Sequence, residues 1–484
     1  MICITVTPRS RTLAKVDMLN AASQGDIIEL CLDHLAKEPD VKDIISTVDK
    51  PVIVSCRRQE DGGHWRGTEE ERLLLLRQAI VAGPDYIELD LDIAPLIPKY
   101  GDVKRLISFT TLDEPETDID SIFDEAAEHH ADVVKFTWPT PTIDDAWPLL
   151  AAVSQKRRLP IVGMGLGRPE ITFSLLGHKY GSPWIYAALE RGMEAHAGQA
   201  TVFDLDEVYD LRGIDRKTTF VAIAGMGEAA TITTKVLNTG FKQMDKNVRC
   251  LPIEIGDLKR LQKMFEKLNI TGVLVFGDVG REIMPMAAHI DKQDFQSQYI
   301  DLLLNRKDGW HGYNTIWRSG LTLLEKALGK TKSGERPLDG RNVLILGTGG
   351  VTQAMAYAVT QRKGLVSICG PDDKRALQIA NLMDCRHVPY QSVYSTLADV
   401  VIIADPALKC GQSHGCLNPS LLKSNMLVMD VSDPPIEHQL MTEARDRGCR
   451  IIETNDVYTH QVAAQFKVLT GDELPIGAIE RALT

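Results

Sequence analysis

The sequence predicts an α/β protein with an N-terminal (β/α)8 barrel and a second α/β part that contains a Rossmann domain. Two patterns lead to this prediction. Up to about residue 212, eight short apolar strands alternate with helical segments, which is typical of a parallel-stranded barrel. Much later, the strand VLIL runs into the glycine-rich turn GTGG and then into a helical segment. A strand, a glycine turn and a helix in this order are typical of dinucleotide-binding domains.

The predicted strands of the barrel follow one another in the order ICITV, DIIELCLD, PVIVSCR, YIELDLD, RLISFTT, DVVKFTW, PIVGMG and SPWIYAAL. Active-site side chains of such barrels lie at the C-terminal ends of the strands. The charged connector DLRGIDRKT then leads to a new strand at 219–224, and a polar stretch with Gly and Pro precedes VLILGTGG. We therefore expect a barrel (1–212), a second α/β domain (217–325), a Rossmann domain (335–450) and a C-terminal helical return to the second domain (451–484).

Composition limits the partners of the protein. The formal net charge is −12 over 484 residues, and no basic stripe offsets it, so we expect no nucleic-acid partner. No apolar run reaches the roughly 18 residues that span a bilayer, and the chain starts directly with a strand-like segment, so we expect a cytoplasmic protein without membrane contact. The nine cysteines form no CxxC pair and are expected to be free thiols. Cys410, His414 and Cys416 lack a fourth ligand, and we expect no metal.

Lys135 is the first candidate catalytic residue. It lies near the end of the strand DVVKFTW, where a barrel would direct it into its mouth among apolar neighbours. Burial lowers the pKa of a lysine, and a neutral amine attacks a ketone to form a Schiff base. A lysine that extends from a strand to the surface is the simpler alternative.

The first part of the chain resembles type I 3-dehydroquinate dehydratases. The segments IIELCLD, VIVSCRRQEDGGHWRGTEEERLLLLRQAI, YIELDLD, ADVVKF and LLGHKYGSPWIYAALERGMEAHAGQ follow one another in the order and spacing of that family. The resemblance implies that Lys135 forms an imine with the substrate ketone. It also implies that Glu29, Arg57 and Gln199 hold the substrate, with Asp90 at the position of the acidic residue of the fourth strand.

Other family positions are altered. The arginine of the second strand appears as Cys31, the histidine that serves as general acid and base appears as Thr110, and an arginine for the substrate carboxylate aligns with Ser174. Loss of a positioned proton-transfer group costs about 100- to 10,000-fold in rate. Arg168 is a candidate substitute cation. His64, His178 and His196 are candidate substitutes for the histidine, and a surface or structural role is the alternative for each.

The second part resembles shikimate dehydrogenases. The segment AGMGEAATITTKVLNTGF matches the opening of that family, with Thr231 and Thr233 at the positions of two substrate-binding serines. DGWHGYNTIWRSGL and THQVAAQF match later segments, and Gln461 falls on a glutamine that contacts substrate. The catalytic lysine of the family aligns with Gly280 and its catalytic aspartate with Ile316, so the resemblance implies an impaired dehydrogenase.

The turn LGTGG carries the cofactor prediction. Gly347, Gly349 and Gly350 would let the backbone approach a pyrophosphate at the N-terminus of the following helix. In the family, an arginine further on pairs with the 2′-phosphate of NADP, and here that turn reads Gly370, Pro371 and Asp372. Since a carboxylate repels a phosphate and accepts from a ribose hydroxyl, NAD is favoured over NADP. We expect no cofactor in the barrel.

Three functions agree with these patterns. The first is a shikimate-pathway enzyme of aromatic amino acid biosynthesis, a dehydratase-like lyase fused to a dehydrogenase. The second is a catalytically degenerate paralogue that binds metabolites or nucleotides as a regulator or scaffold. The third is an enzyme in which Lys135 forms a Schiff base with a different oxo-acid. All three imply a small-molecule substrate or ligand, and the oligomeric state stays open, a homo-oligomer included.

Overall fold

The computed structural model describes residues 1–37, 39–116, 118–329, 336–408 and 417–483. The chain divides into two compact units. Unit 1 comprises Met1–Thr219 and Asn247–Met264, and unit 2 comprises Phe220–Lys246 and Phe265–Thr484. Each unit is described by itself below.

Unit 1 is a nearly closed parallel barrel of eight strands, as the sequence predicts. The hydrogen-bonded order is β7-β6-β5-β4-β3-β2-β1-β8, and β7 and β8 are the two strands without a mutual ladder. The strands are β1 (Ile2–Val6), β2 (Ile27–Cys31), β3 (Val52–Ser55), β4 (Tyr86–Asp90), β5 (Lys104–Thr110), β6 (Val133–Pro139), β7 (Ile161–Leu166) and β8 (Ile185–Ala188). Because side chains alternate along a strand, every second residue faces the barrel interior.

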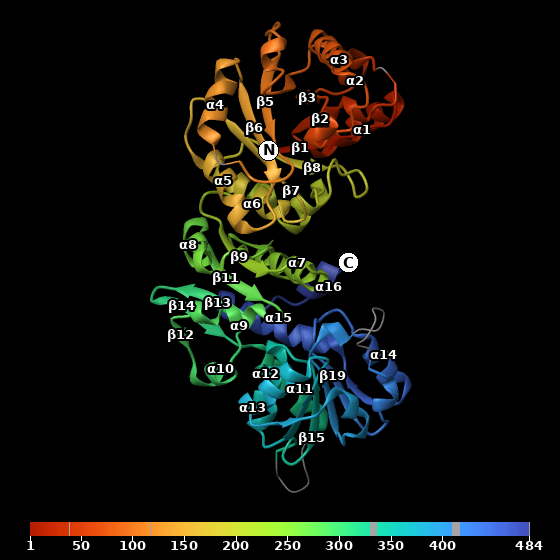
Figure 1. Ribbon diagram of the computed structural model, residues 1–484, viewed down its shortest axis with the longest axis vertical. Coiled ribbons are helices and arrows are strands. Elements are labelled where there is room, and N and C mark those ends of the chain that lie inside the picture. The colour runs from red at the N-terminus through yellow and green to blue at the C-terminus, as the bar shows by residue number, and fades with distance from the viewer. Residues whose placement is uncertain (38, 117, 330–335, 409–416, 484) are drawn as a thin grey trace. The chain divides into compact units, whose positions relative to one another are not determined.

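Helices surround these strands in Figure 1. They are α1 (Arg11–Gln24), α2 (Val41–Ile45), α3 (Glu69–Ala82), α4 (Ile119–Glu128), α5 (Ile143–Ser154) and α6 (Glu170–Tyr180). The sequence marks several helix starts by capping. Thr68 accepts from the backbone N–H of Glu71, whose carboxylate accepts from the backbone N–H of Thr68, a reciprocal cap that satisfies two amides at once. Strand β10 (Val248–Ile253) lies in the second stretch of unit 1, and Thr172 of α6 donates to the carbonyl of Pro252.

Unit 2 contains two sheets. In the first, β9 (Thr219–Ala224), β11 (Ile270–Val275), β13 (Leu302–Arg306), β14 (Gly309–Tyr313) and β12 (His289–Ile290) are neighbours in this order. The pairs β9–β11 and β12–β14 are parallel, whereas β11–β13 and β13–β14 are antiparallel. The helices before the second sheet are α7 (Glu228–Gln243), α8 (Leu258–Leu268, which starts in unit 1), α9 (Val279–Glu282), α10 (Lys292–Gln296) and α11 (Ile316–Leu328).

The second sheet of unit 2 has the Rossmann strand order. Its six parallel strands are arranged β17-β16-β15-β18-β19-β20, which is 3-2-1-4-5-6 in chain order. The strands are β15 (Asn342–Leu346), β16 (Leu365–Cys369), β17 (Arg386–His387), β18 (Val400–Ile403), β19 (Leu427–Asp430) and β20 (Arg450–Ile452). Residues of the central strands fall alternately into two buried apolar clusters, one on each face. The chain order reverses between β15 and β18, where ligands of such sheets bind.

Helices cover both faces of this sheet. They include α12 (Gly350–Thr360), α13 (Asp373–Leu382), α14 (Gln439–Asp446) and α15 (Thr454–Thr470). The last helix, α16 (Ala478–Leu483), packs on α7 instead. Phe466 of α15 stacks on Phe241 of α7, with ring centroids 5.4 Å apart, so the C-terminal helices contact the first sheet's side of unit 2. In the part of the chain that the structure describes, no helix is long and apolar enough to cross a membrane.

Candidate functional site

The barrel interior changes from apolar to polar toward the C-terminal ends of its strands. Cys3, Ile27, Val133 and Tyr186 belong to the apolar cluster in the interior. Two residues further along their strands, Thr5, Glu29 and Lys135 face the same way, because the side-chain period of a strand is two. The positions that face inward near the mouth are therefore those that carry polar and charged groups.

Lys135 forms an ion pair with Glu88 inside the barrel. Its Nζ atom lies 3.0 and 3.1 Å from the two carboxylate oxygens of Glu88 on β4. The ring of Tyr186 on β8 lies below the ammonium, with 4.5 Å from Nζ to the ring centroid. Only 1% of the lysine side chain is exposed, so the simpler alternative of a surface lysine is excluded.

Arg57 joins the same cluster from the loop after β3. Its guanidinium contacts one oxygen of Glu29 and lies 3.3 Å from Glu88. The second oxygen of Glu29 has no hydrogen-bond partner among the described residues. Two carboxylates and two cations thus lie together in the interior. Removal of any one of them would leave a buried charge without its partner.

The two carboxylates differ in their electrostatics. Burial alone would raise the pKa of Glu88, but Arg57 and Lys135 hold that pKa well below its usual range. Burial raises the pKa of Glu29, and Arg57 offsets this increase only in part. At neutral pH, Glu88 is therefore the firmly ionised member that faces the lysine.

A cavity of about 230 Å³ opens at this cluster. It is lined by Arg57, Asp61, Gly62, Thr110, Leu112, Lys135, Thr137, Met164, Leu166, Gly167, Ala195, His196 and Ala197. Arg57 and Lys135 are the two cationic side chains of the lining, and His196 is its one histidine. The cavity combines a buried amine, a guanidinium and an imidazole.

Asp90 and Gln199, two other predicted substrate residues of the barrel, do not line this cavity. Asp90 pairs with Arg72 of α3 at 2.7 Å, and burial raises its pKa to about 6. The amide of Gln199 donates to Thr5 at 3.3 Å and accepts from the backbone N–H of Ala195. Glu88, rather than Asp90, is the carboxylate of β4 that meets the lysine. Contact of Asp90 and Gln199 with a substrate stays a prediction.

The altered family positions lie in contrasting places. Thr110 lines the cavity, where a histidine would face the substrate. Cys31 is buried beside Ser55, and burial raises the pKa of its thiol well above the usual value. Ser174 is buried within α6, whereas the candidate substitute Arg168 is exposed and does not line the cavity.

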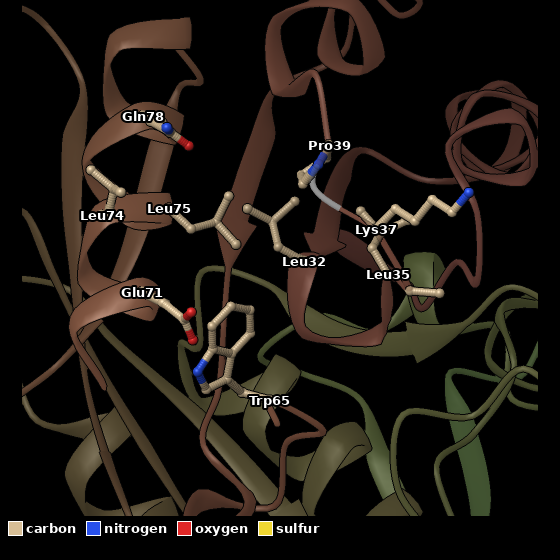
Figure 2. Close-up of a pocket in the computed structure, with 10 residues that line it drawn as sticks. Leu32, Leu35, Lys37, Pro39, Trp65, Glu71, Leu74, Leu75 and Gln78 are labelled. Atoms are coloured by element: carbon tan, nitrogen blue, oxygen red, sulfur yellow. The ribbon is translucent and has the colours of Figure 1, made fainter. Parts of the chain in front are cut away.

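Unit 1 contains further cavities. Figure 2 shows one of about 360 Å³, where Leu32, Leu75 and Trp65 face a largely apolar space. Another, of about 1030 Å³, is lined among others by His34 and His64. Their ring centroids are 4.1 Å apart.

Metal-ligand side chains are grouped at two places among the described residues. Asp33, His34 and His64 form one group in unit 1, and His289, Asp308 and His311 form one in unit 2. In the first group, Asp33 already accepts from the backbone N–H groups of Arg57 and His64. The cluster of Cys410, His414 and Cys416 lies outside the described residues.

The glycine turn of unit 2 lies between β15 and α12, at the position that the sequence predicts. Gly347 has a φ of +152°, and a side chain there would meet Thr352 at 2.6 Å. Gly350 packs against the side chain of Tyr299. A Cβ atom on it would lie 2.2 Å from the buried ring of Tyr299. The absence of a side chain at Gly350 thus makes room for a protein ring.

A carboxylate already occupies the N-terminus of α12. Asp278 accepts a hydrogen bond of 3.1 Å from the backbone N–H of Gly350. It also forms an ion pair with Arg375 at 2.6 Å. A helix N-terminus of this kind binds anions such as a pyrophosphate. In this geometry the residues do not fit a pyrophosphate unless Asp278 moves. Asp372 caps α13 by accepting from the backbone N–H of Arg375.

The predicted substrate residues of unit 2 are placed by helices. Thr231 and Thr233 lie within α7 and donate to the carbonyls four residues before them. Thr231 is exposed and Thr233 is buried. Gln461 lies in α15 and is buried. Their binding of a substrate stays a prediction.

The two altered catalytic positions of unit 2 are apolar and closed. A side chain on Gly280 would lie 2.1 Å from the carbonyl of Ile300, and Ile316 is buried at the start of α11. Next to them, Asp301 is fully buried and accepts from both the backbone N–H and the hydroxyl of Thr315. Burial raises the pKa of Asp301 to about 6.

Comparison with known proteins gives related results for both parts. The family described as type I 3-dehydroquinase matches residues 2–216. A bifunctional 3-dehydroquinate dehydratase/shikimate dehydrogenase of Arabidopsis thaliana, named as chloroplastic, is 23% identical over 98% of this chain and 83% of its own length. A shikimate dehydrogenase (NADP(+)) of Moorella thermoacetica is 26% identical over 56% of this chain and 94% of its own. A solved structure of dehydroquinate dehydratase and shikimate dehydrogenase from S. pombe AroM covers 100% of this chain and 98% of its own, with 17% identity and a TM-score of 0.42.

The fold and the site define the class as a lysine-bearing (β/α)8 barrel joined to a unit with a Rossmann sheet. Residues 2–216 form a domain of the type I 3-dehydroquinase family. The remainder is shikimate dehydrogenase-like, so the chain has the bifunctional arrangement of the shikimate pathway.

Proposed function

We propose that the barrel is a lyase that forms a Schiff base between Lys135 and a ketone of the 3-dehydroquinate type. The observation that carries this proposal is that Lys135 lines the cavity while its Nζ contacts Glu88 at 3.0 Å. Glu88 orients the amine, which must lose a proton before it attacks the ketone. The condensation releases one water, and the imine then acidifies the adjacent carbon so that a β-hydroxyl can leave.

Arg57 would bind a carboxylate of the substrate. It is the second cation of the cavity lining, and a guanidinium pairs with carboxylates through two parallel hydrogen bonds. Inside the barrel, Glu29 forms an ion pair with the guanidinium of Arg57. The proposed substrate is therefore a small oxo-acid, and 3-dehydroquinate is the one that the relatives' names suggest.

Borohydride trapping tests this proposal. The purified full chain is incubated with 3-dehydroquinate and sodium borohydride, and its intact mass is read. We expect one reduced adduct in the wild type and none in Lys135→Ala. Lys104→Ala, which removes an exposed lysine of β5, should keep the adduct. A folded wild type without an adduct, or an adduct that persists in Lys135→Ala, would contradict the proposal.

For unit 2 we propose a binding role with impaired dehydrogenase activity. Gly280 and Ile316 leave the proposed substrate site without a lysine and aspartate to move a proton, and Asp278 covers the N-terminus of α12. A nucleotide cofactor is supported by the relative named as NADP(+)-dependent, and Asp372 favours NAD over NADP because a carboxylate repels a 2′-phosphate. Calorimetric titration with each nucleotide tests this, and no heat with either would contradict nucleotide binding.

A catalytically degenerate regulator or scaffold is the second candidate for the whole chain. The altered positions Cys31, Thr110 and Ser174 favour it. In that case, 3-dehydroquinate would bind without an adduct. The trapping experiment therefore distinguishes the two candidates directly.

A further inference from the structure

Glu170 and His196 form an isolated polar pair at the cavity wall. The Nε2 atom of His196 lies 3.7 Å from Oε2 of Glu170. That oxygen and both ring nitrogens of His196 are buried and have no side-chain hydrogen-bond partner among the described residues, and the backbone of Ala197 is the polar group that faces the ring. Only 2% of the Glu170 side chain is exposed. Because buried polar groups without a partner destabilise a fold, this pair requires an explanation.

We propose that His196 is the proton-transfer group of the barrel and that Glu170 positions it. This rests on the proposed Schiff-base function and deepens it. His196 would take over the role that the altered position Thr110 leaves open, from a different element of the barrel. Thr110 lies on β5, whereas His196 lies in the loop after β8.

The backbone holds this loop directly against the start of α6. Gly198 has a φ of +89°, and a Cβ atom on it would lie 2.6 Å from the carbonyl oxygen of Gly167. Only glycine permits both this conformation and this contact. Gln199 ties the same loop down, because its side chain bonds the backbone N–H of Ala195 and the hydroxyl of Thr5. The imidazole is thereby fixed between Glu170 and the cavity that Lys135 lines.

The surroundings keep the imidazole of His196 neutral. Burial lowers the pKa of His196 to about 4, with Arg57 and Lys135 as the charged groups that face it. Burial raises the pKa of Glu170 well above its usual value. At neutral pH the imidazole is therefore neutral and can act as a base. When it takes up a proton, Glu170 is the carboxyl group beside it that can stabilise the positive charge in a desolvated site.

The proton balance of the step follows from this. Once the imine has formed, neutral His196 takes a proton from the carbon next to it, and the electron pair of that C–H bond moves into the conjugated system. The imidazolium then gives the proton to the departing hydroxyl, which leaves as water. His196 ends neutral, so no further acid, oxidant or metal is consumed. Glu170, as a carboxyl or carboxylate, orients the ring and stabilises the transient cation.

The decisive experiment separates imine formation from proton transfer. Full-length wild type, His196→Gln and Glu170→Gln are compared by borohydride trapping, by turnover of 3-dehydroquinate, and by exchange of its α-protons in deuterated water. Both substitutions are close in size to the original side chain. His64→Gln is the matched control, because His64 lines another cavity and does not line this one.

We expect both variants to form the trapped imine as the wild type does. His196→Gln should lose turnover and proton exchange by about 100-fold or more. Glu170→Gln should lose about tenfold or more in kcat with KM unchanged, as expected for a residue that orients a histidine. His64→Gln should behave as the wild type.

Three results would overturn the proposal. Unchanged turnover in His196→Gln would show that another group moves the proton. Loss of the trapped imine in His196→Gln or Glu170→Gln would show that the pair supports the fold of the cavity instead. A wild type that traps the imine without any turnover would exclude proton transfer while leaving the Schiff base intact. By contrast, if the wild type traps no imine, the proposed Schiff-base function is wrong, and the role proposed for Glu170 and His196 is wrong with it.

Discussion

The carboxylate of Asp278 accepts a hydrogen bond from the backbone N–H of Gly350, the first residue of α12. Asp278 lies in the loop after β11, 72 residues before Gly350 in the chain. Its second oxygen pairs with Arg375. A side chain of the protein thus fills the position that a phosphate would occupy in a dinucleotide-binding domain.

Removing this carboxylate should strengthen nucleotide binding. In Asp278→Asn, the repulsion of a pyrophosphate disappears and Arg375 becomes available to the ligand. We expect about tenfold tighter binding of NAD, since a charge near a helix N-terminus is worth about 0.3–1 kcal/mol and the freed arginine adds a similar amount. Calorimetric titration measures it.

Asp291→Asn is the control, because Asp291 also pairs with an arginine, Arg318, but accepts its backbone hydrogen bonds from the start of α10 and not of α12. Equal or weaker binding of NAD to Asp278→Asn would show that the carboxylate does not compete with the nucleotide.

The glycine turn offers a second prediction, on stability. Gly350→Ala would place a Cβ atom 2.2 Å from the ring of Tyr299, whereas in Gly349→Ala the nearest atom would be Asp278 Oδ1 at 3.2 Å. We expect Gly350→Ala to lower the free energy of unfolding by about 1–3 kcal/mol, as overpacking of a core does. Gly349→Ala should lower it much less. Urea unfolding followed by circular dichroism compares the two, and equal effects would contradict the packing of Tyr299.

The ion pair of Lys135 and Glu88 should behave as a coupled unit. Lys135→Met leaves Glu88 buried with Arg57 as its remaining cation, and we expect a loss of about 2–4 kcal/mol in stability, near the lower end for a broken buried pair. The double variant Lys135→Met/Glu88→Gln should be more stable than the single variant. A double-mutant cycle in urea measures this coupling. Additive losses would mean that the two groups do not interact.

Asp301 gives a prediction for pH. Burial raises its folded-state pKa to about 6, whereas an unfolded aspartate has a pKa of about 3.9. The folded state therefore holds the extra proton between these values, and its contribution to stability is complete below about pH 4 and lost as the pH rises through about 6. The difference of about two pKa units corresponds to roughly 3 kcal/mol.

Urea unfolding of unit 2 at pH 4.5 and pH 7, monitored in the wild type and in Asp301→Asn, tests this. The substitution should reduce the decrease in stability between the two pH values. If the loss of stability between pH 4.5 and pH 7 is the same in Asp301→Asn as in the wild type, other carboxyl groups cause it. Asp90 is then the first to examine, because its pKa is also raised to about 6.

The strands were predictable because they are short apolar runs at regular intervals, and burial on both faces makes them so. All eight barrel strands and the strand before the glycine turn lie where the sequence places them. The position of Lys135 also followed from the sequence, since the alternation along β6 and the family resemblance agree there.

The partners of these residues could not be predicted in the same way. Glu88 and Asp90 face the same side of β4, and only the height of each in the barrel decides that Glu88 meets Lys135 and Asp90 meets Arg72. Glu170 looks in the sequence like an ordinary acidic residue in the first turn of a helix. Asp278 gave no signal, because it meets the glycine turn through contacts between distant segments.

The cluster of Glu29, Arg57, Glu88 and Lys135 has a consequence for the speed of ligand capture. Its charges sum to zero, so the barrel interior creates little long-range field, while the whole chain carries a formal charge of −12. An organic anion that approaches the cavity is therefore repelled at a distance and attracted only on contact with Arg57. Salt screens the repulsion over about 8–10 Å but not the buried contact, so the association rate of an anionic substrate should rise with ionic strength.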